Sequence, residues 1–187
     1  RSTAWYYEAV AYVTRNNLMV GTGTMTFSPD EEMNRAMLVT VLYRLNGAPS
    51  VAGMTAPFED VPQDAWYADA VTWAYNCGVA SGTSATTFSP MADITREQMM
   101  TMFYGYAVYM DYNTMAVADL SVFPDSGDVS SWAEAKLGWA VANSLIKGVK
   151  ESDGVYLRPR ATATRAEAAA ILRSFDQWRV NAVVTGK

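Results

Sequence analysis

The segment Phe88-Ser89-Pro90, followed by five residues and then Arg96, decides the fold, because its frame occurs three times in the chain. The other two copies keep the same six-residue interval from Pro to Arg: Phe27-Ser28-Pro29 to Arg35, and Leu157-Arg158-Pro159 to Arg165. Proline fixes its own φ and favours an extended conformation in the residue before it. Each copy should therefore turn sharply and direct its Phe or Leu into the core.

A helix is predicted to begin at each of these Arg residues. The apolar residues that follow have the i, i+3, i+4, i+7 spacing of an amphipathic helix. They are Leu38, Val41, Leu42 and Leu45; Met99, Met102, Phe103 and Tyr106; and Ala168, Ile171, Leu172 and Phe175. Thr95 with Gln98, and Thr164 with Glu167, fit a capping box, whereas Asn34 is a good N-cap without a reciprocal partner.

Another helix is predicted upstream of each turn, starting at a Trp that precedes the Arg by 30, 30 and 33 residues (Trp5, Trp66 and Trp132). In the middle copy one helical face would hold Trp66, Ala70, Trp73, Ala74 and Cys77. A Gly stands sixteen residues after each Trp (Gly21, Gly82 and Gly148), and we expect it to end the helix in a left-handed turn.

The chain therefore reads as an all-α protein of three helix-loop-helix units, at residues 1–48, 58–110 and 123–178. The repeat period is 61 and then 66–69 residues, and units of that size bury too little apolar surface to be stable alone. We expect the three units to share one core in a single compact domain. Only four residues precede Trp5, so we expect the sequence to be part of a longer protein.

Composition argues against several classes of function. The net charge is −5 with no basic stripe, which argues against a nucleic-acid partner. The chain has no His and a single Cys, Cys77, so no metal site, cofactor or disulfide framework is expected. No apolar run reaches the roughly 18 residues of a membrane span. Carboxylate pairs such as Glu31 with Glu32, or Asp125 with Asp128, lack a fixed catalytic geometry, and we expect no enzyme and no catalytic residue.

Two pairs of motifs resemble the S-layer homology domain, which usually occurs as three tandem copies. They are Phe58-Glu59-Asp60-Val61 with Thr95-Arg96-Glu97, and Phe123-Pro124-Asp125 with Thr164-Arg165-Ala166-Glu167. The first unit lacks the Phe-x-Asp element and reads Asn34-Arg35-Ala36-Met37. The resemblance covers residues 5–178. It implies a pseudo-threefold single-chain trimer around a central helical bundle, with the first helices of the units inside and the second helices outside.

The resemblance also implies a function. Such domains anchor a larger surface protein, without a covalent bond, to a bacterial secondary cell-wall polysaccharide that often carries pyruvylated amino sugars. The implied location is extracellular, at the cell surface or cell wall, and the sugar would lie in grooves between units with the motif Arg on its acid. The alternative is a structural module for protein–protein assembly within a surface layer.

The Arg residues are candidates on physical grounds as well. A cation in the first turn of a helix opposes the macrodipole by roughly 0.3–1 kcal/mol, so each Arg should have an anionic partner. That partner is either an internal carboxylate, such as Asp60 or Asp125, or an acid of the ligand. The Trp residues are expected in the core, with stacking on a sugar as the alternative. The candidate ligand-binding set is Arg35, Arg96, Arg165, Asp60, Asp125, Trp66, Trp132, Gly82 and Gly148.

Overall fold

The computed structural model describes residues 4–185, which are mostly helical and confirm the predicted all-α class. The α-helices are α1 (Tyr7–Arg15), α2 (Arg35–Leu45), α3 (Ala68–Asn76), α4 (Arg96–Tyr109), α5 (Glu134–Ala142) and α6 (Arg165–Thr185). Two 3-10 turns, η1 (Leu120–Val122) and η2 (Ser126–Asp128), precede α5. The longer loop of the third unit forms an antiparallel hairpin of β1 (Val149–Lys150) and β2 (Val155–Tyr156), which the sequence did not predict.

The second helix of each unit begins at its Arg, as predicted, and the caps explain why. The Asn34 side chain accepts a hydrogen bond from the Met37 amide at 2.8 Å. Thr95 and Gln98 form the reciprocal capping box at the start of α4. Helix α6 continues to Thr185, well past residue 178, although the sequence there has no clear helical signal.

The first helices begin two residues after the Trp, and this displaces the Trp side chains from the core. Trp5, Trp66 and Trp132 are 67%, 59% and 48% exposed, so the expectation of core burial is wrong. The buried tryptophans are Trp73 and Trp139, each seven residues further along and inside a helix. Only a residue within the helix is carried onto its inner face, whereas the leading Trp lies in the preceding turn.

The predicted role of the glycines also needs correction, because none of the three ends a helix. The left-handed residues come earlier, just after the helix ends, at Asn17 (φ 55°), Gly78 (φ 69°) and Ser144 (φ 57°). Of the three aligned glycines only Gly148 is left-handed, with φ 78°. A Cβ on Gly21 or Gly82 would lie 2.5 Å from a carbonyl oxygen of the following loop. These two positions therefore require glycine because the backbones approach closely.

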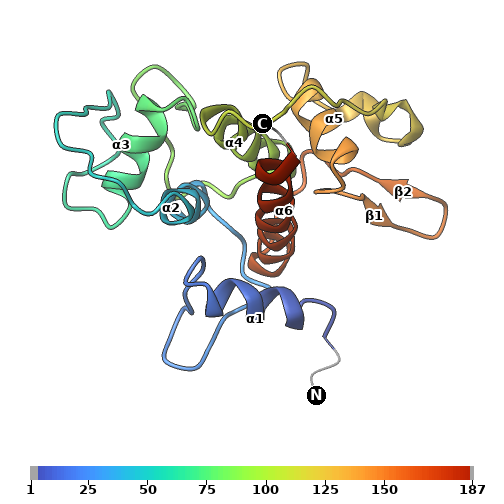
Figure 1. Cartoon of the computed structure of the whole chain (residues 1–187), viewed down its shortest axis with the longest axis horizontal. Helices are drawn as coiled ribbons and strands as arrows, with labels where there is room; N and C mark the ends of the chain where they lie inside the picture. The colour runs from blue at the N-terminus through green and yellow to red at the C-terminus, as the bar shows by residue number, and fades with distance from the viewer. Residues whose placement is uncertain (1–3, 186–187) are drawn as a thin grey trace.

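The second helices lie at the centre and the first helices lie outside them, the reverse of the expected arrangement. Figure 1 shows α2, α4 and α6 side by side in the middle, with α1, α3 and α5 around them. The reason is the distribution of apolar residues. In α4 the buried residues Met99, Met100, Met102, Phe103 and Tyr106 cover more than one face, and a helix that is apolar on several faces belongs in the core.

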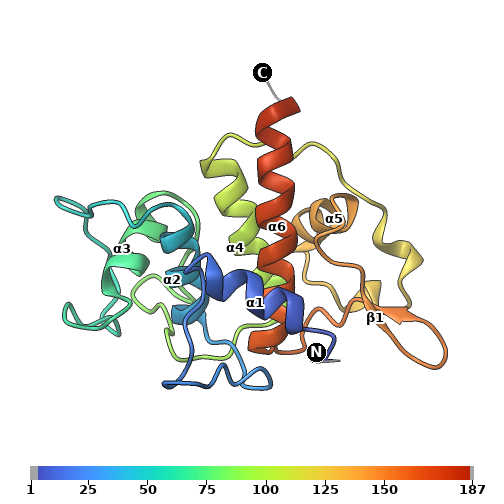
Figure 2. The ribbon, with the colours of Figure 1, turned by 60° about the horizontal axis from the view of Figure 1, so that its bottom comes forward.

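Each first helix packs against the second helix of another unit. Helix α1 packs on α6, α3 packs on α2, and α5 packs on α4. Figure 2 shows α1, from the first unit, lying across α6, from the last. No unit therefore completes its core alone, and the beginning of the described chain closes on its end.

Three backbone hydrogen bonds link the residues that lie two positions before the Arg residues. The Met33 amide donates to the Ala163 carbonyl at 2.8 Å, the Ile94 amide to the Met33 carbonyl at 2.8 Å, and the Ala163 amide to the Ile94 carbonyl at 3.2 Å. All three side chains are buried. These bonds form a closed cycle through the three units.

The α1–α6 contact predicts a stability effect at Tyr12, whose hydroxyl donates to the Asp176 carboxylate at 2.5 Å. Because this bond reaches a charged group in a part-buried place, Tyr12→Phe should lower the free energy of unfolding by about 1.5 kcal/mol. Urea denaturation is the measurement. The control is Tyr7→Phe in the same helix, where the ring is exposed. Equal stability of the two variants would show that this bond does not hold the ends together.

Candidate functional site

The three Arg residues at the starts of the second helices are buried, with exposures of 5% for Arg35, 6% for Arg96 and 5% for Arg165. Each reaches into the Phe-x-Pro or Leu-x-Pro turn of another unit. Nε donates to a turn carbonyl in every case: Arg35 to Phe88 at 2.8 Å, Arg96 to Leu157 at 3.0 Å, and Arg165 to Phe27 at 2.9 Å. The repeated motif thus joins units to each other.

Arg35 and Arg165 share two further contacts. Nη2 of Arg35 donates to the Ser81 carbonyl and Nη2 of Arg165 donates to the Val20 carbonyl, both at 2.7 Å. The Arg35 guanidinium also lies 4.6 Å from the centre of the Phe88 ring, and that of Arg165 lies 4.7 Å from the Phe27 ring. Arg96 differs, because its Nη1 is 3.4 Å from the Glu167 carboxylate.

The charges on Arg35 and Arg165 have no close counterion in the described part of the chain. Within residues 4–185, neither guanidinium forms an ion pair with a carboxylate. Burial lowers the pKa of both groups from the ordinary arginine value, and the more distant Asp60 and Glu31 only oppose that effect. Arginine stays protonated in proteins, so each site holds a partly desolvated cation that an external anion would stabilise.

Asp60 and Asp125 are not the internal partners of the Arg residues; an internal carboxylate pairs only with Arg96 among the described residues, and it is Glu167. Asp60 accepts from the backbone amides of Phe88 and Ser89 at 2.8 and 2.7 Å. Asp125 accepts from the amides of Leu157 and Arg158 at 2.9 and 2.7 Å. Ser89 and Arg158 have φ of 57° and 50°, a left-handed conformation that costs energy for a residue with Cβ. The two aspartates therefore hold the strained turn whose carbonyl the Arg then binds.

Arg35 and Arg165 each line a groove between the units. The Arg35 groove, about 820 Å³, lies over α4 and is lined by residues that include Arg35, Gly82, Gln98, Thr101, Trp132 and Lys136. The Arg165 groove, about 480 Å³, lies over α2 and is lined by residues that include Gly21, Met37, Thr40, Arg44, Trp66 and Arg165. Each groove thus combines an Arg, a loop glycine and an exposed Trp, and each of the three comes from a different unit.

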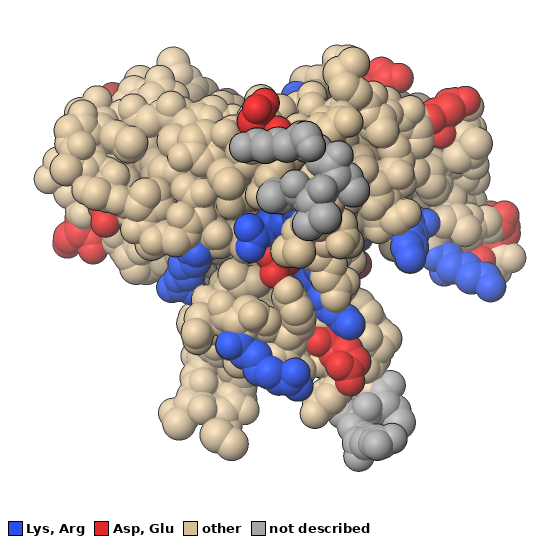
Figure 3. Space-filling model, in the orientation of Figure 1, with Lys and Arg blue, Asp and Glu red and all other residues tan. Residues whose placement is uncertain are grey.

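The charge of both grooves is opposite to that of the chain. Each lining includes two cations, Arg35 with Lys136 and Arg165 with Arg44, and among the described residues neither lining includes Asp or Glu. The whole chain has a net charge of −5, and most of the face shown in Figure 3 is uncharged. Thr40 adds a buried hydroxyl in the Arg165 groove that has no hydrogen-bond partner in the described part of the chain.

The structure brings together part of the candidate set. Gly82 and Trp132 join Arg35 in one groove, and Trp66 joins Arg165 in the other. Arg96, Gly148, Asp60 and Asp125 line neither groove. Most other lining residues were not among the candidates, including the polar or charged Thr40, Arg44, Gln98 and Lys136. Only Lys136 had a signal, since it lies one helical turn after Trp132, and its Nζ is 5.9 Å from the indole ring.

Comparison with known proteins gives the family. The model of the S-layer homology domain matches residues 1–36 and 57–100. The chain belongs to the S-layer homology domain family. It is 32% identical, over 88% of its length, to a surface-layer 125 kDa protein of Lysinibacillus sphaericus. It is 26% identical, over 96% of its length, to an endoglucanase of Bacillus sp. (strain KSM-635), and 26% identical, over 84%, to a cellulosome-anchoring protein of Acetivibrio thermocellus.

These matches define the chain as a cell-surface anchoring module of bacterial type. It spans 13% of the surface-layer protein, 18% of the endoglucanase and 35% of the cellulosome-anchoring protein. The S-layer homology domain is a non-catalytic anchoring domain, found in cell-surface and cell-wall-associated proteins. The third unit lies outside the matched segments, yet its Arg165 makes the same carbonyl contacts as Arg35. No helix in residues 4–185 has both the length and the apolar character to cross a bilayer.

The turn clamp predicts the effect of Asp60→Ala. Removing the carboxylate leaves two part-buried amides without an acceptor and releases the turn that Arg35 binds, so the free energy of unfolding should fall by about 2 kcal/mol. Thermal and urea denaturation measure this. The nearby exposed Asp64 supplies the control variant Asp64→Ala. A stability loss no larger than that of the control would contradict the clamp.

Proposed function

We propose that this chain anchors its parent protein to the cell wall by binding an acidic, pyruvylated secondary cell-wall polysaccharide in the Arg35 groove and the Arg165 groove. The observation that supports this most directly is electrostatic. In an acidic chain, both grooves bring two cations together, and no carboxylate of residues 4–185 lines either one. An anionic ligand compensates both cations, whereas a neutral ligand leaves the buried one unpaired.

We also propose that the units at 1–48, 58–110 and 123–178 form one compact domain with pseudo-threefold symmetry. Three features favour this arrangement: the closed cycle of Met33, Ile94 and Ala163, the cyclic packing of first helices on second helices, and the equivalent composition of the two grooves. Each groove in this scheme is an interface between units. Ligand binding would then depend on correct closure of the whole chain.

The buried Arg suits a carboxylate in both geometry and cost of binding. A guanidinium has five N–H donors, and the two carbonyl contacts of Arg35 or Arg165 leave donors for a ligand acid. Because those carbonyls and a Phe ring already fix the side chain, little conformational entropy is lost on binding.

The other groove residues suit the body of a sugar. The loop glycine, Gly82 or Gly21, lines each groove and contributes backbone there. Trp66 and Trp132 present exposed rings that can cover the apolar face of a pyranose. An acid-binding cation beside an aromatic platform is the chemistry expected for an acidic glycan.

Protein–protein assembly is the second candidate function. Its support is a set of exposed apolar side chains on the segment between α4 and α5: Met115, Val117 and Val122. These three residues line neither groove. Experiments can therefore distinguish glycan binding from assembly, because substitutions in the grooves should leave assembly unchanged.

The exposed Trp residues provide the cleanest test of glycan binding. Trp66→Ala and Trp132→Ala should each weaken binding of the affected groove to soluble pyruvylated cell-wall polysaccharide by about tenfold, since stacking contributes about 1 kcal/mol beyond the lost apolar contact. Unfolding temperature should change little, because both side chains are exposed. Substitution of the Arg residues is less informative, because the three are buried and bind carbonyls of another unit.

The control for this test is Trp5→Ala, which removes an exposed Trp that lines neither groove. Binding is measured by calorimetry with polysaccharide before and after chemical removal of the pyruvyl groups. Loss of affinity on depyruvylation supports an acid contact. Equal binding by wild type, Trp66→Ala and Trp132→Ala, or no binding by wild type, would overturn the proposal and favour the assembly function.

A further inference from the structure

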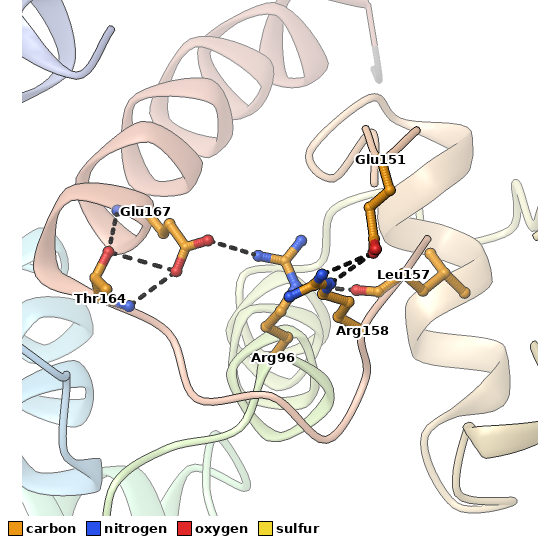
Figure 4. Close-up of polar contacts among 6 residues, drawn as sticks. All are labelled: Arg96, Glu151, Leu157, Arg158, Thr164 and Glu167. Atoms are coloured by element: carbon orange, nitrogen blue, oxygen red, sulfur yellow. Dashed lines mark hydrogen bonds and ion pairs between the residues drawn. The ribbon is translucent and has the colours of Figure 1, made fainter. Parts of the chain in front are cut away.

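The third residue of each second helix differs among the units in charge. It is Met37 in α2, Gln98 in α4 and Glu167 in α6. All three are half-buried, and Met37 and Gln98 line the Arg165 groove and the Arg35 groove. Glu167 takes the corresponding place beside Arg96, with Oε1 3.4 Å from Nη1 (Figure 4). This position therefore faces the buried Arg of another unit.

Glu167 uses its two oxygens for different partners. Oε2 accepts from the Thr164 amide at 2.9 Å and caps α6, while Oε1 faces Arg96. Burial lowers the pKa of Arg96, as it does for Arg35 and Arg165, and the adjacent Glu167 carboxylate opposes part of that effect, as the more distant Asp60 and Glu31 do at the other two. Of the three buried guanidinium groups, that of Arg96 is the one with an ion-pair partner among residues 4–185.

The cap itself does not require a negative charge. Gln98 accepts from the Thr95 amide at 3.2 Å and completes the same capping box in α4. The amide of a Gln can thus replace the carboxylate of a Glu in this role. The negative charge of Glu167 is therefore not needed for the cap, and what it adds is the ion pair with Arg96.

The turn next to Arg96 is also internally paired. In the first two units a hydroxyl pair closes the loop, Thr22 with Ser28 and Thr83 with Ser89, at 2.7 Å in both. In the third unit the residue equivalent to Ser89 is Arg158, and it forms an ion pair with Glu151 at 2.8 Å (Figure 4). The two cations near this position, Arg96 and Arg158, are therefore each matched by a carboxylate.

We propose that Glu167 takes the place of the ligand acid at Arg96, so that the chain accepts acidic glycan at Arg35 and Arg165 and excludes it at Arg96. This inference rests on the proposed function. An incoming carboxylate at Arg96 must displace Glu167 or lie beside it, and like charges in a partly desolvated site repel strongly. The third residue of the second helix is then a specificity-determining residue that sets which sites accept an anion.

The test is the number of binding sites, measured by calorimetry with a soluble monovalent glycoside of a pyruvylated amino sugar. Wild type should bind two equivalents. Glu167→Gln should bind three, because Gln keeps the cap and removes the charge. The reciprocal change Gln98→Glu should leave one. The NMR signals of the Arg side-chain Nε–H groups identify the sites: Arg35 and Arg165 should shift in wild type, and Arg96 should join them in Glu167→Gln.

The control is Glu134→Gln in the exposed first turn of α5, which changes net charge equally and should still bind two equivalents. Thermal unfolding of each variant checks that the caps remain intact. Two outcomes would overturn the role of Glu167 and leave the proposed function standing. One is three binding sites in wild type; the other is an unshifted Arg96 Nε–H signal in Glu167→Gln while the signals of Arg35 and Arg165 shift. Absence of binding in wild type and in every variant would overturn both.

Discussion

The structure depends on a guanidinium group at the start of each central helix that binds the backbone of another unit. A cation is unfavourable at that end of a helix, and burial adds a desolvation cost. The fold offsets both by placing turn carbonyls against Nε of Arg35, Arg96 and Arg165. Since the carbonyls always come from another unit, the same contact that satisfies the Arg also closes the cycle of three units.

That contact explains the position of the surrounding parts. The Pro-containing turn must present one carbonyl inward, and Asp60 or Asp125 fixes it by binding two amides of the same turn. The carbonyl dipoles are weaker than a full negative charge, so Arg35 and Arg165 keep an uncompensated charge at the base of a groove. Structure and anion binding thus arise from the same side chain. Some N–H groups of the guanidinium bind carbonyls and stabilise the fold, while its positive charge remains available to a ligand in the groove.

The sequence was sufficient for whatever depends on local pattern. Apolar spacing and capping residues located the starts of α2, α4 and α6, and the repeat identified the Arg residues that connect the units. It was insufficient where a partner distant in the chain decides. Trp66 and Trp73 share a predicted helical face, yet only Trp73 is within the helix and buried. Gly82 is required by the close approach of the Thr87 carbonyl, and no local pattern gives that distance. The order of inside and outside helices is a different case: the expected order came from the resemblance, whereas the apolar residues on several faces of α4 agree with its central position.

The three units show that closure and charge are encoded at separate positions. The backbone cycle and the Nε–carbonyl bonds are the same in all three units, including the one where Glu167 pairs with Arg96. The third helical residue needs only an acceptor or an apolar side chain to be compatible with the fold, as Met37 and Gln98 show. Its charge can therefore vary without loss of closure, and a repeat protein of this kind can change its anion sites one unit at a time while keeping a single core.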